Sequence, residues 1–380
     1  MNVKRGVLYT SLALLLGACS HNAETTSAKP ENQKEEMEAE ETVKVKKQPD
    51  QKVKEATKLD NSKPVETSIK ISAAGDFTLG TDESFSYAGT FNAEAEKNGL
   101  GFFTRNIKNI FENDDLTTVN LETTLTNATQ KAAKTFRFKG DPSYVNILKN
   151  GSVEAVNLAN NHTMDYLQQG YDDTIANLKK AHIGYFGYKD QYITTVKGVK
   201  VGALGYKGWD DTAESRQQIK DGIQSLRNQG AQIVLVHFHW GDEKQYVPNG
   251  TQTALGRFAV DNGADLVLGH HPHVVQGIEE YKGKFIVYSL GNFMFGGNKN
   301  PSDKDTFVYQ QTFHIKNGKL TDQKEIKIIP FRISSVAARN NYQPTPLEGE
   351  EAERVKNKIL NLSDKISGSD WVAYEAKNNH

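Results

Sequence analysis

The stretch Ala264-Asp265-Leu266-Val267-Leu268-Gly269-His270-His271-Pro272-His273 carries the strongest structural signal in the chain. Its short apolar run stops at a glycine, which is typical of a buried strand that ends in a turn. Three imidazoles follow, and imidazole is the commonest protein ligand for metals such as zinc. A lone histidine is more simply explained as a surface group. The clustering of histidines instead predicts a metal site at the end of a strand.

Similar polar endings recur along the chain. His237 and His239 close a second apolar run at 233–236, and other expected strands are followed by carboxylates and amides. In open α/β sheets the carboxyl ends of parallel strands form the ligand crevice, so these side chains are expected to converge. The full series is Asp76, Asn120, Glu122, Asn161, His162, His237, His239, His271, His273 and Asn292.

Strand and helix signals alternate from residue 68 to about residue 340, which favours an α/β fold with much parallel sheet. Apolar runs predict strands at 69–73, 116–121, 153–159, 183–185, 201–205, 233–236, 265–268 and 285–290. Helical periodicity is present at 103–111, 165–180, 212–228 and 251–262. Strands at 306–315 and 325–333, joined through Asn317-Gly318, predict an antiparallel extension.

The two ends of the chain differ from this domain, which we place at 68–340. Residues 341–380 are polar, and 346–362 is expected to form a helix with acidic residues in its first turn. We interpret 341–380 as a peripheral helical appendage. Residues 20–67 contain no aromatic residue and mix nine Lys with eleven Asp or Glu. Such a segment cannot bury enough apolar surface to fold, so we expect 19–67 to be a disordered charged tether.

Residues 1–18 are expected to be a lipoprotein signal peptide. Lys4 and Arg5 precede the apolar run 7–16, which is too short to cross a bilayer as a permanent helix. Leu16-Gly17-Ala18-Cys19 resembles the bacterial lipobox, in which the cysteine is acylated and becomes the new N-terminus. The alternative is an incidental cysteine in an ordinary signal peptide. We therefore expect an extracytoplasmic protein, anchored by lipid on Cys19 to the bacterial cell membrane.

Composition excludes several classes of function. The formal net charge of −1 gives no electrostatic footprint for nucleic acid, so no nucleic-acid partner is expected. The single cysteine excludes an internal disulfide framework. A hydrophobic content of 37% over 380 residues is enough for at least one real core.

The expected ligand set suits a dinuclear metal centre. Carboxylate, amide oxygen and imidazole together hold Mn, Fe or Zn ions, and a carboxylate can bridge two of them. Two such ions lower the pKa of a bridging water and neutralise charge on a phosphoryl group, while a nearby imidazole can protonate the leaving oxygen. Each motif alone also has a structural explanation, such as a capping carboxylate at Gly75-Asp76 or an Asx turn at Asn160-Asn161. Their recurrence at strand ends favours the metal site.

Six motifs, in this order, resemble the bacterial capsule synthesis family typified by the poly-gamma-glutamate proteins CapA and PgsA, over roughly residues 69–333. The motifs are Gly75-Asp76, Asn120-Leu121-Glu122, Ala159-Asn160-Asn161-His162, His239-Trp240-Gly241-Asp242-Glu243, Gly269-His270-His271-Pro272-His273-Val274 and Ser289-Leu290-Gly291-Asn292-Phe293. That family is similar to the calcineurin-like metallophosphoesterases. The resemblance therefore implies their four-layer α/β/β/α sandwich with a centre of two divalent metal ions.

The resemblance also implies individual roles. Glu122 stands where the superfamily has a bridging Asp, and His162 matches a proton donor. Position 78, where many phosphoesterases have a histidine, holds Thr78. The metal ligands implied are Asp76, Glu122, Asn161, His239, His271 and His273. The residues expected to face substrate or to support the ligands are Asn120, Asn160, His237, His270 and Asn292.

Two classes of function follow from the resemblance. In the first, the protein is a metal-dependent phosphoesterase that hydrolyses a phosphorylated or otherwise activated anionic substrate during capsule or poly-gamma-glutamate synthesis. In the second, it is a non-hydrolytic accessory protein that binds the anionic polymer and couples its synthesis to export. Both imply membrane components of a capsule synthesis complex as partners.

Overall fold

The computed structural model describes residues 65–366 together with Trp371 and Tyr374. The expected signal peptide, Cys19 and nearly all of the expected tether lie outside the described residues. The tether prediction extended to residue 67, whereas the first strand begins at Glu66. Glu66 and Thr67 pair with Lys316 and Ile315, so they already belong to the sheet.

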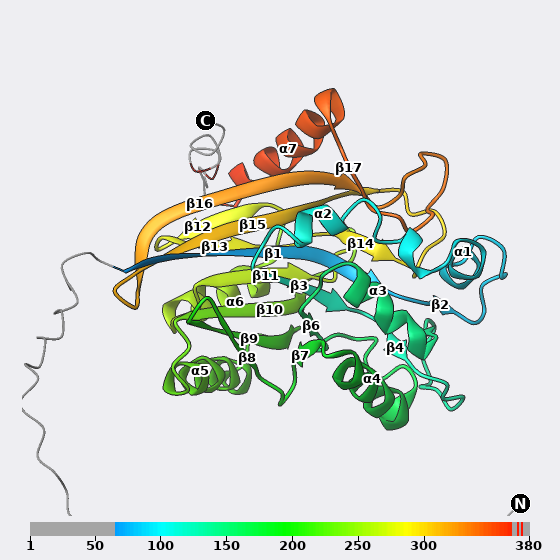
Figure 1. The fold of residues 1–380 in the computed structure, drawn as a ribbon, viewed down its shortest axis with the longest axis horizontal. Coiled ribbons are helices and arrows are strands. Elements are labelled where there is room, and N and C mark those ends of the chain that lie inside the picture. Colours follow the sequence, from blue (N-terminus) through cyan, green and yellow to red (C-terminus); the bar gives the residue numbers. More distant parts are fainter. Residues whose placement is uncertain (1–64, 367–370, 372–373, 375–380) are drawn as a thin grey trace, which may run out of the picture. The chain divides into compact units, whose positions relative to one another are not determined.

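The described residues form a mixed α/β fold in which two large sheets carry most of the structure (Figure 1). The first sheet is mixed. Its strands in spatial order are β17 (Thr345–Pro346), β16 (Lys319–Arg332), β15 (Asp305–Lys316), β1 (Glu66–Thr78), β3 (Leu116–Leu121), β6 (Ala155–Asn157) and β7 (Gly184–Phe186), with β14 (Asn292–Phe295) paired to the end of β1. β1, β3, β6 and β7 are mutually parallel, whereas β15 and β16 form the antiparallel extension around Asn317-Gly318.

The second sheet is built around four parallel strands. Its order is β12 (Ile278–Tyr281), β13 (Lys284–Val287), β11 (Leu266–His270), β10 (Ile233–Trp240), β9 (Val199–Gly208) and β8 (Tyr192–Val196). A small third sheet contains β2 (Thr81–Asp82), β5 (Phe138–Gly140) and β4 (Thr124–Leu125). Every residue of β10 is buried, which is expected for a parallel strand that is covered on both faces.

Alternation along the strands explains how the two large sheets pack. Ile233 and Leu235 of β10 share one core cluster with Ile69 and Ile71 of β1, so this cluster lies between the sheets. The intervening residues, such as Val234 of β10, belong to a different cluster that includes residues of α5 and α6. Because successive side chains of a strand point to opposite faces, each central strand contributes to two apolar layers.

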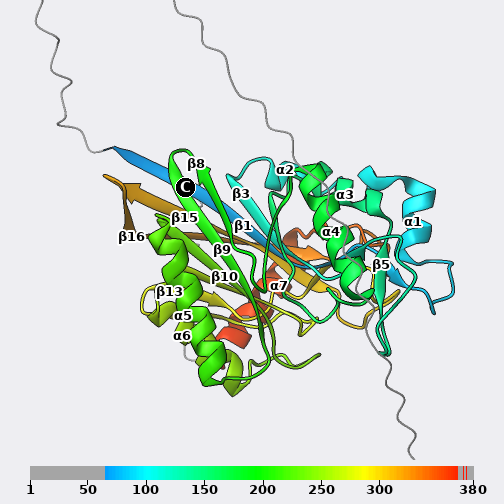
Figure 2. The ribbon, with the colours of Figure 1, turned by 90° about the horizontal axis from the view of Figure 1, so that it is seen from below.

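Helices cover the outer faces of both sheets. The helices packed on the first sheet are α1 (Phe91–Asn98), α2 (Lys108–Phe111), α3 (Val145–Asn150) and α4 (Leu167–Ala181), with short 3-10 turns η1 (Leu100–Phe102) and η2 (Pro142–Tyr144). Those on the second sheet are α5 (Ala213–Asn228) and α6 (Gly250–Asp261), which run side by side in Figure 2. The helix predicted at 103–111 is reduced to the four-residue α2. None of the described helices is both long and apolar enough to cross a membrane.

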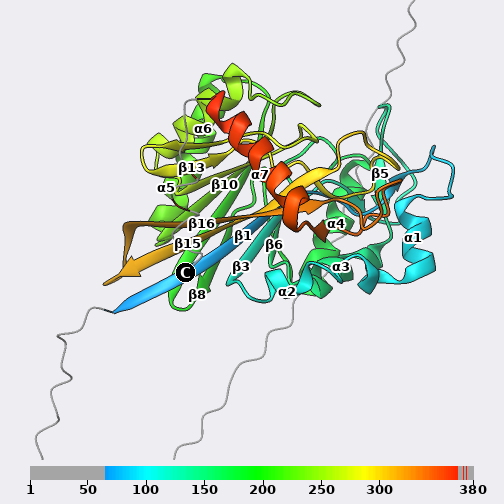
Figure 3. The same ribbon diagram turned by 90° about the horizontal axis from the view of Figure 1, so that it is seen from above.

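The last helix, α7 (Gly349–Asp364), packs into the core. Val355, Ile359 and Leu362 join the cluster between the two large sheets, and α7 contacts β12 and β16 (Figures 1 and 3). Lys358 also donates to Asp303 at 2.7 Å and to Asp305 at 2.9 Å. The segment that the sequence suggested as a peripheral appendage therefore completes the apolar core.

We expect Ile359→Ala to lower the free energy of unfolding by about 2–5 kcal/mol, because the substitution leaves a cavity at a fully buried position. Glu353→Ala is the matched control, since Glu353 is exposed on the same helix and should change stability by about 0.5 kcal/mol or less. Denaturant unfolding of both variants measures the difference. Equal, small effects would show that α7 does not stabilise the core.

Candidate metal centre

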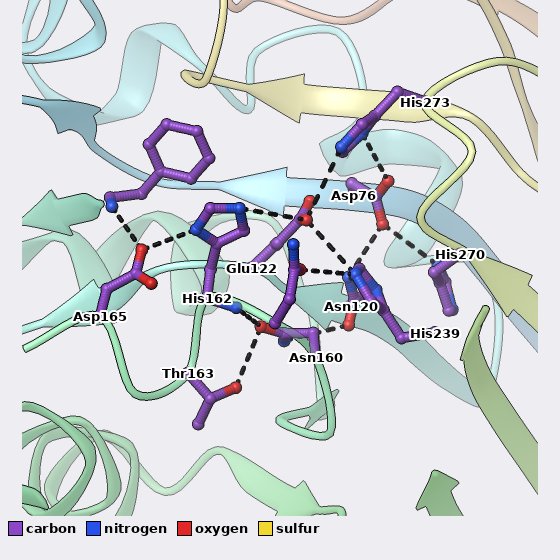
Figure 4. Close-up of polar contacts among 12 residues, drawn as sticks. Asp76, Asn120, Glu122, Asn160, His162, Thr163, Asp165, His239, His270 and His273 are labelled. Atoms are coloured by element: carbon purple, nitrogen blue, oxygen red, sulfur yellow. Dashed lines mark hydrogen bonds and ion pairs between the residues drawn. The ribbon is translucent and has the colours of Figure 1, made fainter. Parts of the chain in front are cut away.

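Several polar side chains predicted from strand ends lie together, and Figure 4 shows Asp76, Glu122 and His239 among them. Asp76 lies in β1 and Glu122 directly follows β3. His239 lies in β10, while His271 and His273 follow β11. The apolar run of β10 was expected to end at residue 236, but the strand continues to Trp240 and carries both histidines with it.

Two groups of three side chains are close enough to share a metal ion. The first contains Glu122, His239 and His271, and the second contains Asp76, Glu122 and His273. In each group the three ligand atoms lie within 4.8 Å of one another. Glu122 belongs to both groups, which is the position of a carboxylate that bridges two ions.

Individual distances define the first group. His239 Nε2 lies 3.5 Å from Glu122 Oε1 and 2.8 Å from Asn161 Oδ1. Asn161 therefore places an amide oxygen beside the first group. His271 stands over His239 with ring centroids 4.7 Å apart. These four side chains provide imidazole, carboxylate and amide donors of the kind that hold Mn, Fe or Zn.

In the second group, His273 lies between two carboxylates. His273 Nδ1 lies 3.2 Å from Asp76 Oδ2, and His273 Nε2 lies 3.8 Å from Glu122 Oε1. Asn292 accepts a hydrogen bond from His273 Nδ1 at 2.9 Å and returns one to its backbone carbonyl at 3.1 Å. Asn292 therefore orients His273.

Unpaired buried atoms show that these residues fit a cation. Among the described residues, neither carboxylate oxygen of Glu122 has a hydrogen-bond partner, and Asp76 Oδ2 and His271 Nδ1 also lack one. Glu122 and Asp76 are both fully buried. Burying two carboxylates together is costly unless cations or donors compensate for the lost hydration. The nearby hydroxyl of Thr78 is buried without a partner as well.

The pKa values of these side chains depend on their burial and on the charges of their neighbours. Burial and the charge of Asp76 raise the pKa of Glu122 well above its ordinary value. Burial alone would lower the pKa of His273, but the carboxylates of Glu122 and Asp76 raise it to about 9. Burial and the neighbouring His273 lower the pKa of His271 to about 4, and burial likewise lowers that of His239. His239 and His271 are thus neutral and ready to bind a metal, whereas the second group retains a proton.

Asn120 connects the two groups. Its amide nitrogen donates to Asp76 Oδ1 at 2.8 Å and lies 3.2 Å from His239 Nδ1. Its oxygen accepts from Asn157 at 2.9 Å and faces the Asn160 amide at 3.4 Å. Asn120 thus contacts the carboxylate of one group and the imidazole of the other.

His237 and His270 lie deeper than the two groups. His237 is bonded to Thr118 Oγ1 at 3.1 Å and to His270 at 3.0 Å, and its ring stacks on that of His270. His270 Nδ1 lies 3.5 Å from Asp76 Oδ1. His237 and His239 point to the same side of β10, but His239 alone reaches Glu122. His270 is fully buried.

His162 presents one ring nitrogen to the centre. Its Nδ1 donates to Asp165 at 2.6 Å, and its Nε2 lies 4.0 Å from Glu122 Oε1. Asp165 also accepts from Lys134 Nζ at 2.7 Å and from the Phe138 amide at 2.6 Å. Burial lowers the pKa of His162, although Asp165 acts in the opposite direction. The geometry fixes the ring so that only Nε2 can exchange a proton at the site.

The backbone adopts turns and strained conformations where it brings these residues close together. Asn160 Oδ1 accepts from the His162 amide at 3.0 Å, so the Asx turn considered as the structural explanation of this motif is present. Gly75 is required beside Asp76, because a Cβ atom there would stand 1.9 Å from the carbonyl oxygen of Gly291. His271 and His273 adopt positive φ angles of 95° and 57°. Such strain is concentrated at functional sites.

Several residues that contact the centre were not predicted from the sequence. Trp209 makes edge-to-face contacts with His239 and His271, at centroid distances of 5.7 and 4.6 Å. Asn157 ends β6 and Trp209 follows β9, whereas the predicted strand 153–159 ran past Asn157 and the predicted strand 201–205 stopped before Trp209. Asp165 and Lys134 come from segments with no comparable signal.

A cleft of about 520 Å³ opens beside the centre. His162 and His273 line its inner end, and four phenylalanines contribute to its walls: Phe85, Phe136, Phe138 and Phe295. A substrate in this cleft would therefore have direct access to both the second ligand group and the ring of His162.

Comparison with known proteins places the chain among capsule proteins. Residues 70–297 match the family described as bacterial capsule synthesis protein PGA_cap. The chain is 32% identical over 304 residues to the PGA biosynthesis protein CapA of Bacillus subtilis (strain 168), covering 74% of this chain and 76% of that protein. It is 33% identical over 210 residues to the capsule biosynthesis protein CapA of Bacillus anthracis, and this match spans only 50% of either chain.

A more distant relative is a probable polyglutamine synthesis accessory protein of Mycobacterium tuberculosis (strain ATCC 25618 / H37Rv), 24% identical over 287 residues and covering 66% of this chain and 73% of that protein. The family match covers the two ligand groups and His162. The chain belongs to the bacterial capsule synthesis protein family PGA_cap.

Proposed function

We propose that this chain is a lipid-anchored, cell-surface protein of poly-gamma-glutamate or related capsule synthesis, with a dinuclear metal centre that hydrolyses a phosphorylated or activated anionic substrate. The observation that carries the proposal is the pair of three-residue groups that share Glu122. The two packed sheets flanked by helices support a metallophosphoesterase-type sandwich. The ordered motifs quoted above agree with that assignment.

Different residues of the chain would bind the metal ions and donate the proton. Glu122 would hold both ions, with His239, His271 and Asn161 on one side and Asp76 and His273 on the other. Two bound divalent ions supply an activated water and neutralise charge on the phosphoryl group. With its Nδ1 proton held by Asp165, His162 would act from the doubly protonated form of the ring and give its Nε2 proton to the leaving oxygen.

The second candidate is a non-hydrolytic accessory that binds the anionic polymer and acts with membrane components of a capsule synthesis complex. Two observations favour it. Thr78 occupies a position where many phosphoesterases have a histidine, and the relative from Mycobacterium tuberculosis carries the word accessory in its name. In that case the ions would bind carboxylates of the polymer.

Paired histidine variants separate metal binding from proton donation. His271→Ala should lose both bound metal and turnover, because it removes a ligand of the first group. His162→Ala should keep metal near the wild-type content but lose about 10²-fold or more in turnover. Metal analysis and hydrolysis of phosphomonoesters and phosphodiesters, measured side by side, test this.

His314→Ala is the control for that pair, since His314 pairs with Glu325 on β15 away from the centre. Equal metal loss in His162→Ala and His271→Ala would contradict the proton-donor assignment. Retained polymer production with no hydrolysis by any variant would favour the accessory function.

Metal binding should release at least one proton per protein at pH 7.5. The carboxylates hold the pKa of His273 at about 9, and the second group must give up this proton before a cation binds. Affinity should therefore fall as the pH is lowered below about 9. Calorimetry in buffers of different ionisation enthalpy measures the release, and His273→Asn should reduce it. Binding without proton release would contradict the assignment of the second group.

Cys19→Ser tests the anchor. The variant should accumulate as an unprocessed precursor or appear in the medium, because the run 7–16 is too short to hold the protein in a bilayer. Metabolic labelling with a fatty acid, followed by cell fractionation, measures the outcome. Lipid labelling that persists in Cys19→Ser would exclude this cysteine as the anchor.

A further inference from the structure

The cleft beside the candidate metal centre has aromatic walls that reach the centre itself. Phe138 stacks on His162 with ring centroids 4.2 Å apart, and Phe295 lies 4.7 Å from the ring of His273. The same two phenylalanines meet edge to face at 6.4 Å. Apolar surface therefore begins directly beside the proposed proton donor and a proposed ligand.

Two more rings extend this surface toward solvent. Phe85 and Phe136 pack edge to face at 6.3 Å, and both line the cleft. The side chain of Phe136 is 50% exposed. A large aromatic residue that remains exposed at the mouth of a binding cleft is a common sign of a ligand contact.

The cleft walls carry balanced charge. Lys244 and Lys299 are offset by Glu243 and Asp303. Lys299 is also occupied, since it donates to Ser86 Oγ at 2.8 Å, and Asp303 accepts from Lys358 at 2.7 Å. Such walls do not form a basic groove. An extended polymer with a carboxylate on every unit would meet phenyl rings and no excess of positive charge in this cleft.

The walls are also fixed in place. Lys299 joins the loop after β14 to the loop that holds Phe85, through the side chain and carbonyl of Ser86. Asp303 accepts from Tyr246 at 2.9 Å, which connects the loop after β10 to the same rim. Three loops distant in sequence are thus joined by hydrogen bonds, and the cleft is preformed. Preorganised walls reduce the entropy lost when a ligand binds.

We infer that this cleft binds the apolar, aromatic-sized portion of an anionic ester whose phosphate-like head group lies on the metal centre. The inference rests on the proposed function for the head group and adds the substrate class. Metal ions held by the proposed centre would match the charged half of the ligand, and the four phenylalanines of the cleft would match the apolar half.

Binding of two phosphonates to the metal-loaded protein tests the inference without requiring turnover. Phenylphosphonate and methylphosphonate share a head group and differ in the ring. In calorimetry, the wild type should bind phenylphosphonate about tenfold or more tightly than methylphosphonate. Phe136→Ala and Phe85→Ala should each reduce that ratio by about three- to tenfold, without changing the affinity for methylphosphonate.

Phe258→Ala is the matched control, because this partly buried phenylalanine lies on α6 and lines no part of the cleft. It should leave the ratio unchanged. Equal affinity for both phosphonates would overturn the inference, and so would a ratio that Phe258→Ala lowers as much as Phe136→Ala. Tighter binding of an oligomer of gamma-linked glutamate, weakened by Phe136→Ala, would also overturn it.

The outcomes for the two proposals are separable. A ring preference that depends on Phe136, found in a protein without hydrolytic activity, would support this inference and contradict the hydrolase. Hydrolysis of phosphoesters with no preference for a ring would support the hydrolase and overturn the inference. Failure of both phosphonates to bind would contradict the head-group site and therefore both proposals.

Discussion

Two carboxylates, Asp76 and Glu122, are buried side by side between the sheets of this protein, and much of the surrounding structure compensates for that burial. In a medium of low polarity, two such charges repel each other and have lost their hydration. The protein responds with imidazoles at 3.2–3.8 Å, with the amide of Asn120, and with buried oxygens left open to a cation. A bound cation would offset the free-energy cost of burying these two carboxylates together.

The topology makes this concentration of charge possible. Parallel strands β1, β3 and β6 of one sheet and β9, β10 and β11 of the other bring their carboxyl ends to one region. Each strand then needs only one or two polar residues at its end, while the preceding residues remain apolar and hold the sheets together. The stability of the core and the chemistry of the centre are therefore separated along every strand.

That separation explains what the sequence could predict. Apolar runs identified the central strands closely, and β3 has the predicted bounds. Residues at strand ends could be named because parallel strands finish together, so Asp76, Glu122 and the histidines could be grouped without a structure. The choice between His237 and His239 required the true end of β10, which continues four residues past its apolar run. Trp209 and Asn157 were missed because the predicted strand at 201–205 was too short and the one at 153–159 ran past the true end of β6.

Contacts between distant loops were beyond prediction, because their partners have no common pattern. Ser86 and Lys299 are 213 positions apart, and Asp303 and Lys358 are 55 apart. The amphipathic period of α7 predicted a helix but not its partner surface, so the C-terminal segment was taken for an appendage. In the structure, Lys358 of α7 holds Asp303, and Asp303 holds Tyr246 at the rim of the cleft. A helix that completes the core is thereby also connected by hydrogen bonds to the rim of the cleft beside the candidate metal centre.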